Sequence, residues 1–422
     1  MCASSAASSE HYQACHSCDW LVQIPTLTEG DVACCPRCGQ PVASHPRFAQ
    51  QRPLVYGLTS LIMLLCANLL PFLAVSTQGM SNKILLYQAA STLFSEDYAS
   101  LGMLIYLVMQ LLPLCCLLLL GYALLRLRWH GPLGLSRWAL RWLFWLQPWG
   151  MVEVFMLGTL VSLIKIAALA EVQVGSGFWC YVAFSLAYLK SFMHLDRNRL
   201  WQQLVGPVPL QVEPVAPCSA RELDLALCHL CHATVPLDLG HCPRCHTRLH
   251  ARQPQSLQRC FALLVAAIIL YVPANLLPMM ITETLGSAIN STILQGVVVL
   301  WKMGDYPVAM VIFFASIMIP IAKILALLWL CYSTYRGSPH HRRGRNRLYH
   351  LTEFVGRWSM VDVFVVAVLA ALIRMGKLMS IYPGDAAVAF ASVVLITMLS
   401  AMAFDSRLIW DPPPSTQARK PE

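Results

Sequence analysis

Eight long runs of apolar residues follow one another along the chain, separated by shorter polar segments. They cover about 54–75, 101–125, 150–172 and 177–194, and then about 259–281, 306–332, 358–380 and 385–404. Each run is close to the roughly 20 residues that a helix needs to cross a hydrocarbon core of about 30 Å. The pattern predicts an all-α polytopic membrane protein with eight transmembrane helices, whose termini lie on the same side of the membrane.

The order of polar and apolar segments occurs twice. Residues 67–71 (Ala-Asn-Leu-Leu-Pro) return as residues 274–278, and the segment 149–155 matches 358–364, so the offset stays between 207 and 209. We therefore expect two tandem repeats, each with a small cysteine module followed by about four helices. The predicted parts are an N-terminal cysteine module at 1–46, a first bundle at 47–201, a proline-rich linker at 202–225, a second cysteine module at 226–252, a second bundle at 253–410 and a disordered tail at 411–422.

Composition supports a membrane protein, because 57% of the residues are hydrophobic and only 12% are charged. The net charge of +9 comes mostly from arginines in the loops that flank one side of the predicted spans, such as 126–141 and 336–347. Loops rich in Arg and Lys stay in the cytoplasm. Both termini and both cysteine modules are therefore predicted to be cytoplasmic, and the positive charge gives no reason to expect a nucleic-acid ligand.

Each repeat opens with two Cys-x2-Cys pairs, the spacing typical of a four-cysteine zinc ribbon. We expect two zinc ions, one per module; iron in the same four ligands, or dithiol cycling, stays open on spacing alone. A closed four-thiolate site has no open position for substrate, so its expected role is structural. Cys34, next to Cys35, could replace it as a ligand. The predicted ligands are Cys15, Cys18, Cys35 and Cys38 in the first module and Cys228, Cys231, Cys242 and Cys245 in the second.

Ionisable residues inside apolar runs are costly and often functional. Lys323 and Asp362 fall at similar depths near the cytoplasmic side, so we expect them to meet, either as a structural ion pair or as a proton-linked or conformational switch. The first half keeps an acid, Glu153, at the position of Asp362 but has Cys116 at that of Lys323, so the functional interpretation applies to the second half. The predicted polar cluster consists of Ser316, Lys323, Ser359, Asp362 and Thr397.

Other features concern the opposite side of the membrane. Lys165 and Arg374 occupy matched positions and, with Lys377, either extend to the outer interface or contact lipid phosphate. The prolines of 67–71 and 274–278 predict kinks in the first and fifth spans. Residues 291–301 place apolar side chains on one helical face, which predicts a helix at the outer interface or against a partner.

Motifs of catalysis are missing from the sequence. There is no Gly-x4-Gly-Lys-Ser/Thr loop, no Ser-His-Asp arrangement and no His-Glu-x-x-His segment. We therefore expect neither nucleotide binding nor enzymatic activity.

Several segments together resemble the paraquat-inducible protein A (PqiA) family, of which LetA is a relative. They are the Cys-Pro-Arg-Cys pairs and residues 94–100, 273–278, 353–364 and 379–383. The resemblance implies an inner-membrane protein of Gram-negative bacteria that acts with a periplasmic MCE-domain partner (PqiB-like), and possibly an outer-membrane lipoprotein, in moving phospholipids between membranes. Two alternatives stay open: a redox or stress-response protein that uses its cysteine modules, and a passive anchor for the MCE partner.

Overall fold

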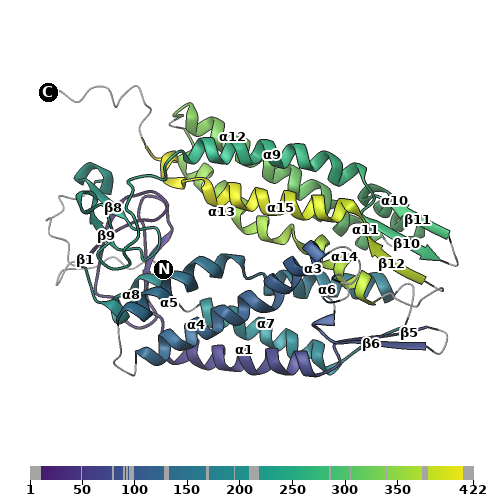
Figure 1. Cartoon of the computed structure of the whole chain (residues 1–422). Helices are drawn as coiled ribbons and strands as arrows, with labels where there is room; N and C mark the ends of the chain where they lie inside the picture. The colour runs from purple at the N-terminus through teal and green to yellow at the C-terminus, as the bar shows by residue number, and fades with distance from the viewer. Residues whose placement is uncertain are drawn as a thin grey trace.

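The chain forms an elongated body, described here from a computed structural model (Figure 1). Two cysteine ribbons lie at one end, helices occupy the middle and two small sheets lie at the other end. The structure describes residues 11–411 apart from 49, 78–79, 89–90, 92–93, 95–98, 128–132, 168–170, 194, 209–217, 285–286, 305, 339 and 373–378. We call residues 50–208 the first half and 253–411 the second half, and residues 11–44 and 219–249 the first and second ribbon.

The helices follow the same order in both halves. The first half contains α1 (Gln51–Leu69), α3 (Ala99–Tyr106), a π-helical segment (Leu107–Leu111), α4 (Leu112–Arg126), α5 (Leu133–Leu146), α6 (Val152–Ala167), α7 (Ser176–Met193) and α8 (Arg197–Val205). The second half contains α9 (Ser256–Leu276), α10 (Ile293–Met303), α11 (Tyr306–Phe313), a π-helical segment (Phe314–Met318), α12 (Ile319–Tyr335), α13 (Arg342–Trp358), α14 (Val361–Leu372) and α15 (Asp385–Ala403). In each half the first and last long helices, α1 with α7 and α9 with α15, pack against each other.

Six segments among the described residues are long and apolar enough to cross a membrane, which makes this a multi-pass membrane protein. They are Gln51–Leu69, Ala99–Arg126, Gly134–Ile164, Ser256–Leu276, Ala309–Tyr335 and Asp385–Ala403. The fourth and seventh predicted spans correspond to α7 and α14, which are absent from this set. The number of eight spans therefore stays a prediction.

The fold is mostly helical, and the prediction of an all-α protein is wrong for the end opposite the ribbons. There, β5 (Leu73–Thr77), β6 (Met80–Ile84) and β7 (Glu171–Val174) form an antiparallel sheet of order β6-β5-β7. The strands β10 (Met280–Thr284), β11 (Ser287–Ser291) and β12 (Met379–Pro383) form a second sheet of order β11-β10-β12. Our predicted apolar runs continued into β5, β7, β10 and β12, because a short apolar strand and the end of an apolar helix look alike in sequence.

The predicted proline kinks are also wrong, because the helices end there. Helix α1 stops at Leu69 and α9 at Leu276, each two residues before a proline, whose ring disfavours helical geometry in the residue before it. The carbonyl oxygen of Pro278 lies so close to Gly384 that any Cβ at this glycine would collide with it. Pro71 meets Gly175 in the same way. These contacts fix the start of α7 and α15 against the preceding helix ends.

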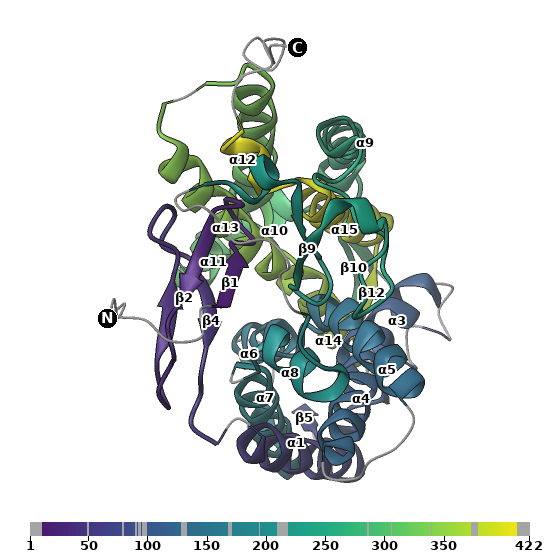
Figure 2. The same cartoon turned by 90° about the vertical axis from the view of Figure 1, so that its left-hand side faces the viewer.

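The two halves meet through α6 and α14, which occupy matched places in the order of helices of each half. Figure 2, viewed from the ribbon end, shows one half above the other with these two helices in the middle. The rings of Phe155 and Phe364, equivalent residues at an offset of 209, lie 5.4 Å apart at an interplanar angle of 84°. A Cβ at Gly158 would lie 2.8 Å from the Cβ of Phe364, and Ser162 Oγ donates to the Gly158 and Val365 carbonyls at 2.8 and 3.3 Å. Gly158 thus permits the close approach of the halves.

Gly158→Leu should weaken the contact between the halves, because the added side chain overfills a packed interface, at a cost of about 1–3 kcal/mol. We expect a lower unfolding temperature of the purified chain than for Gly121→Leu, a matched change in α4 where a Cβ meets no atom within 4 Å. Equal unfolding temperatures for the two variants would contradict the packing described here.

Candidate metal centres and a cavity between the two halves

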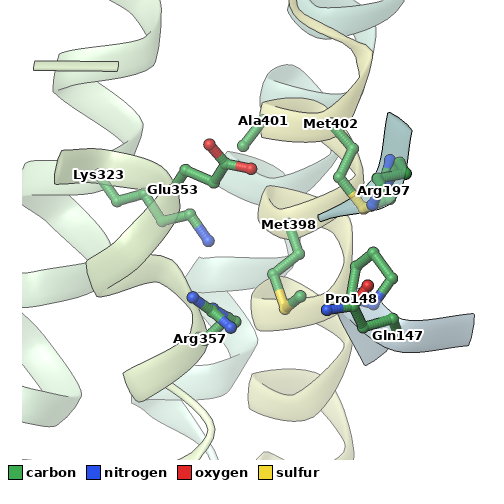
Figure 3. A pocket seen from close by; sticks show the side chains of 9 residues that line it. All are labelled: Gln147, Pro148, Arg197, Lys323, Glu353, Arg357, Met398, Ala401 and Met402. Carbon is green, nitrogen blue, oxygen red and sulfur yellow. The ribbon is translucent and has the colours of Figure 1, made fainter. Parts of the chain in front are cut away.

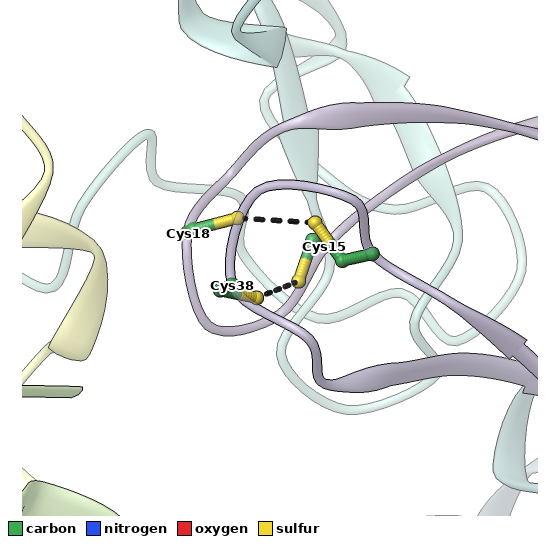
Figure 4. Close-up of side chains that lie close together, drawn as sticks. Cys15, Cys18 and Cys38 are labelled. Carbon is green, nitrogen blue, oxygen red and sulfur yellow. Dashed lines mark hydrogen bonds between the residues drawn. The ribbon is translucent and has the colours of Figure 1, made fainter. Parts of the chain in front are cut away.

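Each set of four predicted cysteine ligands converges on one point. Within each set the sulfur atoms all lie within 4.8 Å of one another. In the first ribbon Cys15 Sγ is 3.5 Å from Cys38 Sγ, and Cys18 Sγ is 3.5 Å from Cys35 Sγ (Figure 4). Four sulfurs around an ion with bonds of about 2.3 Å would be separated by about 3.8 Å. The donor set therefore fits a tetrahedral metal ion, and it contains Cys35 instead of the adjoining Cys34.

The second ribbon repeats this geometry. Cys228 Sγ lies 3.4 Å from Cys245 Sγ and Cys231 Sγ lies 3.5 Å from Cys242 Sγ, with all four side chains buried. The predicted grouping of thiols is thus confirmed in both modules, and the identity of the ion as zinc stays a prediction.

A recurring turn positions every Cys-x2-Cys pair. The residue after the second cysteine donates its backbone N–H to the carbonyl of the first, at 2.9 Å for Asp19, 2.8 Å for Gly39, 3.0 Å for His232 and 2.8 Å for His246. All four residues have a positive φ, between 55° and 78°. Only one is glycine, so three residues adopt a backbone conformation that costs free energy unless their surroundings impose it. A metal ion bound by the two cysteines of the turn would supply such a constraint.

The strands of the ribbons are short and form three two-stranded sheets: β1 (His11–Ala14) with β2 (Leu21–Ile24), β3 (Val32–Cys34) with β4 (Pro41–Ser44), and β8 (Leu225–Leu227) with β9 (Thr234–Pro236). Modules of this size have too little apolar surface to fold on a core alone. Metal binding is the expected source of the missing stability.

The thiols influence one another's acidity. Contacts from Cys15 and Cys18 lower the pKa of Cys38 to about 7, and contacts from Cys228 and Cys231 lower the pKa of Cys242 to about 7. Contacts from Cys15 and Cys35 raise the pKa of Cys18, and contacts from Cys228 and Cys242 raise the pKa of Cys231. Four thiolates this close repel, so full deprotonation of either group requires a cation among them.

The first ribbon packs mainly against the second half. The hydroxyl of Ser17 lies 2.9 Å from Nε2 of His350 in α13, and the guanidinium of Arg37 lies 4.8 Å from the ring centre of Trp410. Cys15, Cys18 and Cys35 share an apolar cluster with side chains of α9 and α12. Its link to the first half includes Ser44, whose backbone N–H and hydroxyl donate to Asp196 at 2.9 and 3.1 Å.

The second ribbon packs in turn against the first half. Arg244 donates to Asn198 at 2.7 Å, and the side chains of Arg137 and His246 lie 2.9 Å apart. The ribbons also touch each other, because the Ala14 N–H donates to Thr234 Oγ1 at 2.9 Å. The first ribbon therefore packs against the second half, and the second ribbon packs against the first half. Nothing in the sequence indicated this crossing, since it depends on contacts between distant segments.

A cavity of about 230 Å³, here called the central cavity, lies between the halves (Figure 3). The side chain of Lys323 is only 4% exposed, runs along Gly356 of α13, and its ammonium has no hydrogen-bond partner among the described residues. The lining residues are Gln147, Pro148 and Arg197 from the first half and Lys323, Glu353, Arg357, Met398, Ala401 and Met402 from the second.

The charged groups of the central cavity have few internal partners. Arg357 Nη1 lies 3.8 Å from Oε1 of Glu153 in α6, an ion pair that joins the halves. The carboxylate of Glu353 lies 3.6 Å from His350 Nδ1. Burial lowers the pKa of Arg197, whose guanidinium lies 4.6 Å from the ring centre of Phe144. Glu353 and Arg357 were not among the predicted site residues, although their spacing of four on an arginine-rich helix indicated one shared face.

A second cavity, of about 210 Å³, adjoins the first beneath the ribbons and shares Glu353 and Met402 with it. Among its lining residues are His16, His232 and His350. Burial lowers the pKa of His16 to about 4 and that of His232 well below its ordinary value, so both rings are neutral at pH 7. Arg407, which also lines this second cavity, forms an ion pair with Asp405 at 2.9 Å, so the excess of cationic side chains lies in the central cavity.

The five residues of the predicted polar cluster are all buried. Ser316, Lys323, Ser359, Asp362 and Thr397 are each at most 8% exposed. Lys323 extends along Gly356 into the central cavity, and its ammonium forms no hydrogen bond with Asp362. The predicted meeting of Lys323 with Asp362 stays a prediction. Glu153, the counterpart of Asp362 in the first half, forms an ion pair with Arg357. The functional role of the cluster stays a prediction.

The predicted outer cations are Lys165, Arg374 and Lys377. Arg374 and Lys377 are outside the described residues. Lys165 lies in α6, but its side chain is not among those described. The predicted apolar helix at 291–301 corresponds to α10, with Ile293 and Val297 buried.

Two four-cysteine ribbons on a polytopic helical membrane body define the class of this protein. The sequence model of the paraquat-inducible protein A family matches residues 50–205 and 257–413, so the chain belongs to that family. It is 45% identical to the "Intermembrane transport protein PqiA" of Escherichia coli (strain K12), over 97% of this chain and 99% of the relative.

Two more distant relatives also match nearly end to end. The "Lipophilic envelope-spanning tunnel protein A" of Escherichia coli (strain K12) is 31% identical, over 97% of this chain and 93% of its own length. The "Probable intermembrane transport protein" of Haemophilus influenzae is 29% identical, over 94% and 95%. No solved structure matches the chain.

Because of the crossed contacts of the ribbons, loss of one metal ion should destabilise the half against which the mutated ribbon packs. Cys18→Ser should lower the bound metal from two ions to one and raise amide hydrogen exchange in α13, whereas Cys231→Ser should raise it in α5 and α8. Metal content is measured by elemental analysis and exchange by mass spectrometry, with Cys66→Ser in α1 as the control. An increase in exchange confined to the first half for Cys18→Ser, and to the second half for Cys231→Ser, would refute the crossing.

Proposed function

We propose that the chain is the inner-membrane component of an MCE-type system that moves phospholipids between the membranes of the envelope. The observation that carries this proposal is the near full-length match to relatives named as intermembrane transport proteins. The two helical halves with a cavity between them supply a body through which a lipid could be received and passed on. We propose no enzymatic reaction for it.

The distribution of charge supports one orientation in the membrane. The arginine-rich start of α13 lies beside the first ribbon, where the Arg343 side chain donates to the carbonyl of Arg37 at 2.9 Å. Since cationic loops stay in the cytoplasm, we place both ribbons there and the two sheets on the periplasmic side, with eight spans in two tandem repeats between them. The sheet end then faces the periplasmic MCE-domain partner, beyond which an outer-membrane lipoprotein could complete the path.

We assign zinc to both ribbons, with a structural role. A closed set of four thiolates has no open coordination position, so the ion would fold the ribbon and chemistry at the metal is not expected. A redox protein would instead hold iron or cycle its thiols, which visible absorbance and thiol titration of the purified chain would reveal.

Phospholipid transfer should require the chain together with its MCE partner. In proteoliposomes holding both proteins, labelled phospholipid should reach acceptor vesicles faster than with either protein alone. The measurement is the initial rate of label transfer. Transfer by the partner alone at the same rate would leave this chain as a passive anchor and contradict the proposal.

Lys323→Ala and Asp362→Ala should each abolish transfer while the protein still accumulates in the membrane, because the proposal gives this buried polar cluster a role in coupling. Lys302→Ala, which removes an exposed lysine of α10, is the matched control and should keep the wild-type rate. Full transfer activity in both cluster variants would make the cluster structural.

A further inference from the structure

The central cavity holds more positive than negative charge. Arg197, Lys323 and Arg357 line it, against one carboxylate, that of Glu353. The carboxylate is already 3.6 Å from the ring of His350 and forms no hydrogen bond with Lys323. An anion entering the cavity would therefore find cationic donors on two sides, one from the first half and two from the second.

Lys323 gives the most direct indication of a missing ligand. Its side chain is nearly buried, and its ammonium lies in the lining of the central cavity without an acceptor among the described residues. A buried ammonium is unfavourable unless hydrogen bonds or an opposite charge compensate for lost water. Figure 3 shows this ammonium directed into the space between Glu353, Arg357 and Met398.

The walls restrict the kind of anion. Met398, Met402, Ala401 and Pro148 make one side apolar, and methionine adapts its shape to what it contacts. The volume of about 230 Å³ is below the roughly 300–1,000 Å³ of pockets that enclose a drug-sized ligand. The cavity thus suits a compact anionic group attached to something apolar, and arginine is the side chain best matched to phosphate oxygens.

We propose that the central cavity binds a phosphate group, that of a phospholipid headgroup, through Arg197, Lys323 and Arg357. The choice of a lipid rests on the proposed function, whereas the phosphate chemistry rests on the cavity itself. The site lies at the junction of the halves, because Arg197 belongs to the first half, whereas Lys323 and Arg357 belong to the second half. The first half carries Cys116 where the repeat has Lys323, so it offers no second cation at that position.

The test is equilibrium binding to the purified, metal-loaded full chain in an uncharged detergent. The ligands are dihexanoyl phosphatidylglycerol, dihexanoylglycerol, which lacks the phosphate, and inorganic phosphate. We expect the phosphatidylglycerol to bind and dihexanoylglycerol not to bind. If inorganic phosphate binds as tightly as phosphatidylglycerol, the same site is assigned to free phosphate. If inorganic phosphate binds much more weakly than phosphatidylglycerol, the site is assigned to the lipid headgroup.

Arg197→Gln, Lys323→Gln and Arg357→Gln should each weaken binding of the phosphatidylglycerol by about tenfold or more, because each removes a charge-assisted contact. Arg347→Gln makes the same change at an exposed position of α13 and should leave binding unaltered.

Equal binding by the three cavity variants and the wild type, or equal binding of dihexanoylglycerol, would overturn the site. Metal content and unfolding temperature without ligand identify a variant that has failed to fold, in which case Arg197→Lys, which keeps the charge, replaces Arg197→Gln and should bind at least tenfold better than Arg197→Ala. This assay omits the partner, so lost transfer with intact binding would count against the proposed function, and intact transfer with lost binding against this site alone.

Discussion

The close approach of α6 and α14 is the contact on which the rest of the arrangement depends. It is possible because Gly158 has no side chain where the backbone of α14 passes, and because Phe155 and Phe364 stack edge to face across the junction. In this position Glu153 reaches Arg357, and the end of α13 faces the turn at Gln147 and Pro148. The central cavity therefore exists only as long as the two halves stay together.

The crossed ribbons fasten the same junction from one end. A metal ion bound by four thiolates would stabilise the Cys-x2-Cys turns, in which three non-glycine residues adopt a positive φ at a cost in free energy. In addition, the first ribbon contacts the second half and the second ribbon contacts the first half. Metal binding would thus contribute to how the halves sit against each other as well as to the ribbons themselves. This gives a structural reason for two metal centres in a protein for which we propose no chemistry at the metal.

Sequence reasoning identified the features that are local or periodic. The cysteine groups follow from their spacing, and the helical segments follow from apolar runs of sufficient length. It failed where a short segment had two possible structures: β5 and β10 were assigned to helices, although Pro71 and Pro278 mark the helix ends. It also could not find the central cavity, because Arg197 and Lys323 are separated by more than a hundred residues and line one cavity only in the packed arrangement of the two halves.

The two halves resemble each other in the order of their elements and differ at the site. Lys323 and Arg357 come from the second half alone, while the first half supplies Arg197 and the acid that pairs with Arg357. A density map of the full chain in a lipid bilayer is the most direct test of the α6–α14 junction. We expect the map to show α6 against α14 at Gly158, the first ribbon on the second half and the second ribbon on the first half. Separated halves, or the first ribbon on the first half and the second ribbon on the second half, would contradict this arrangement.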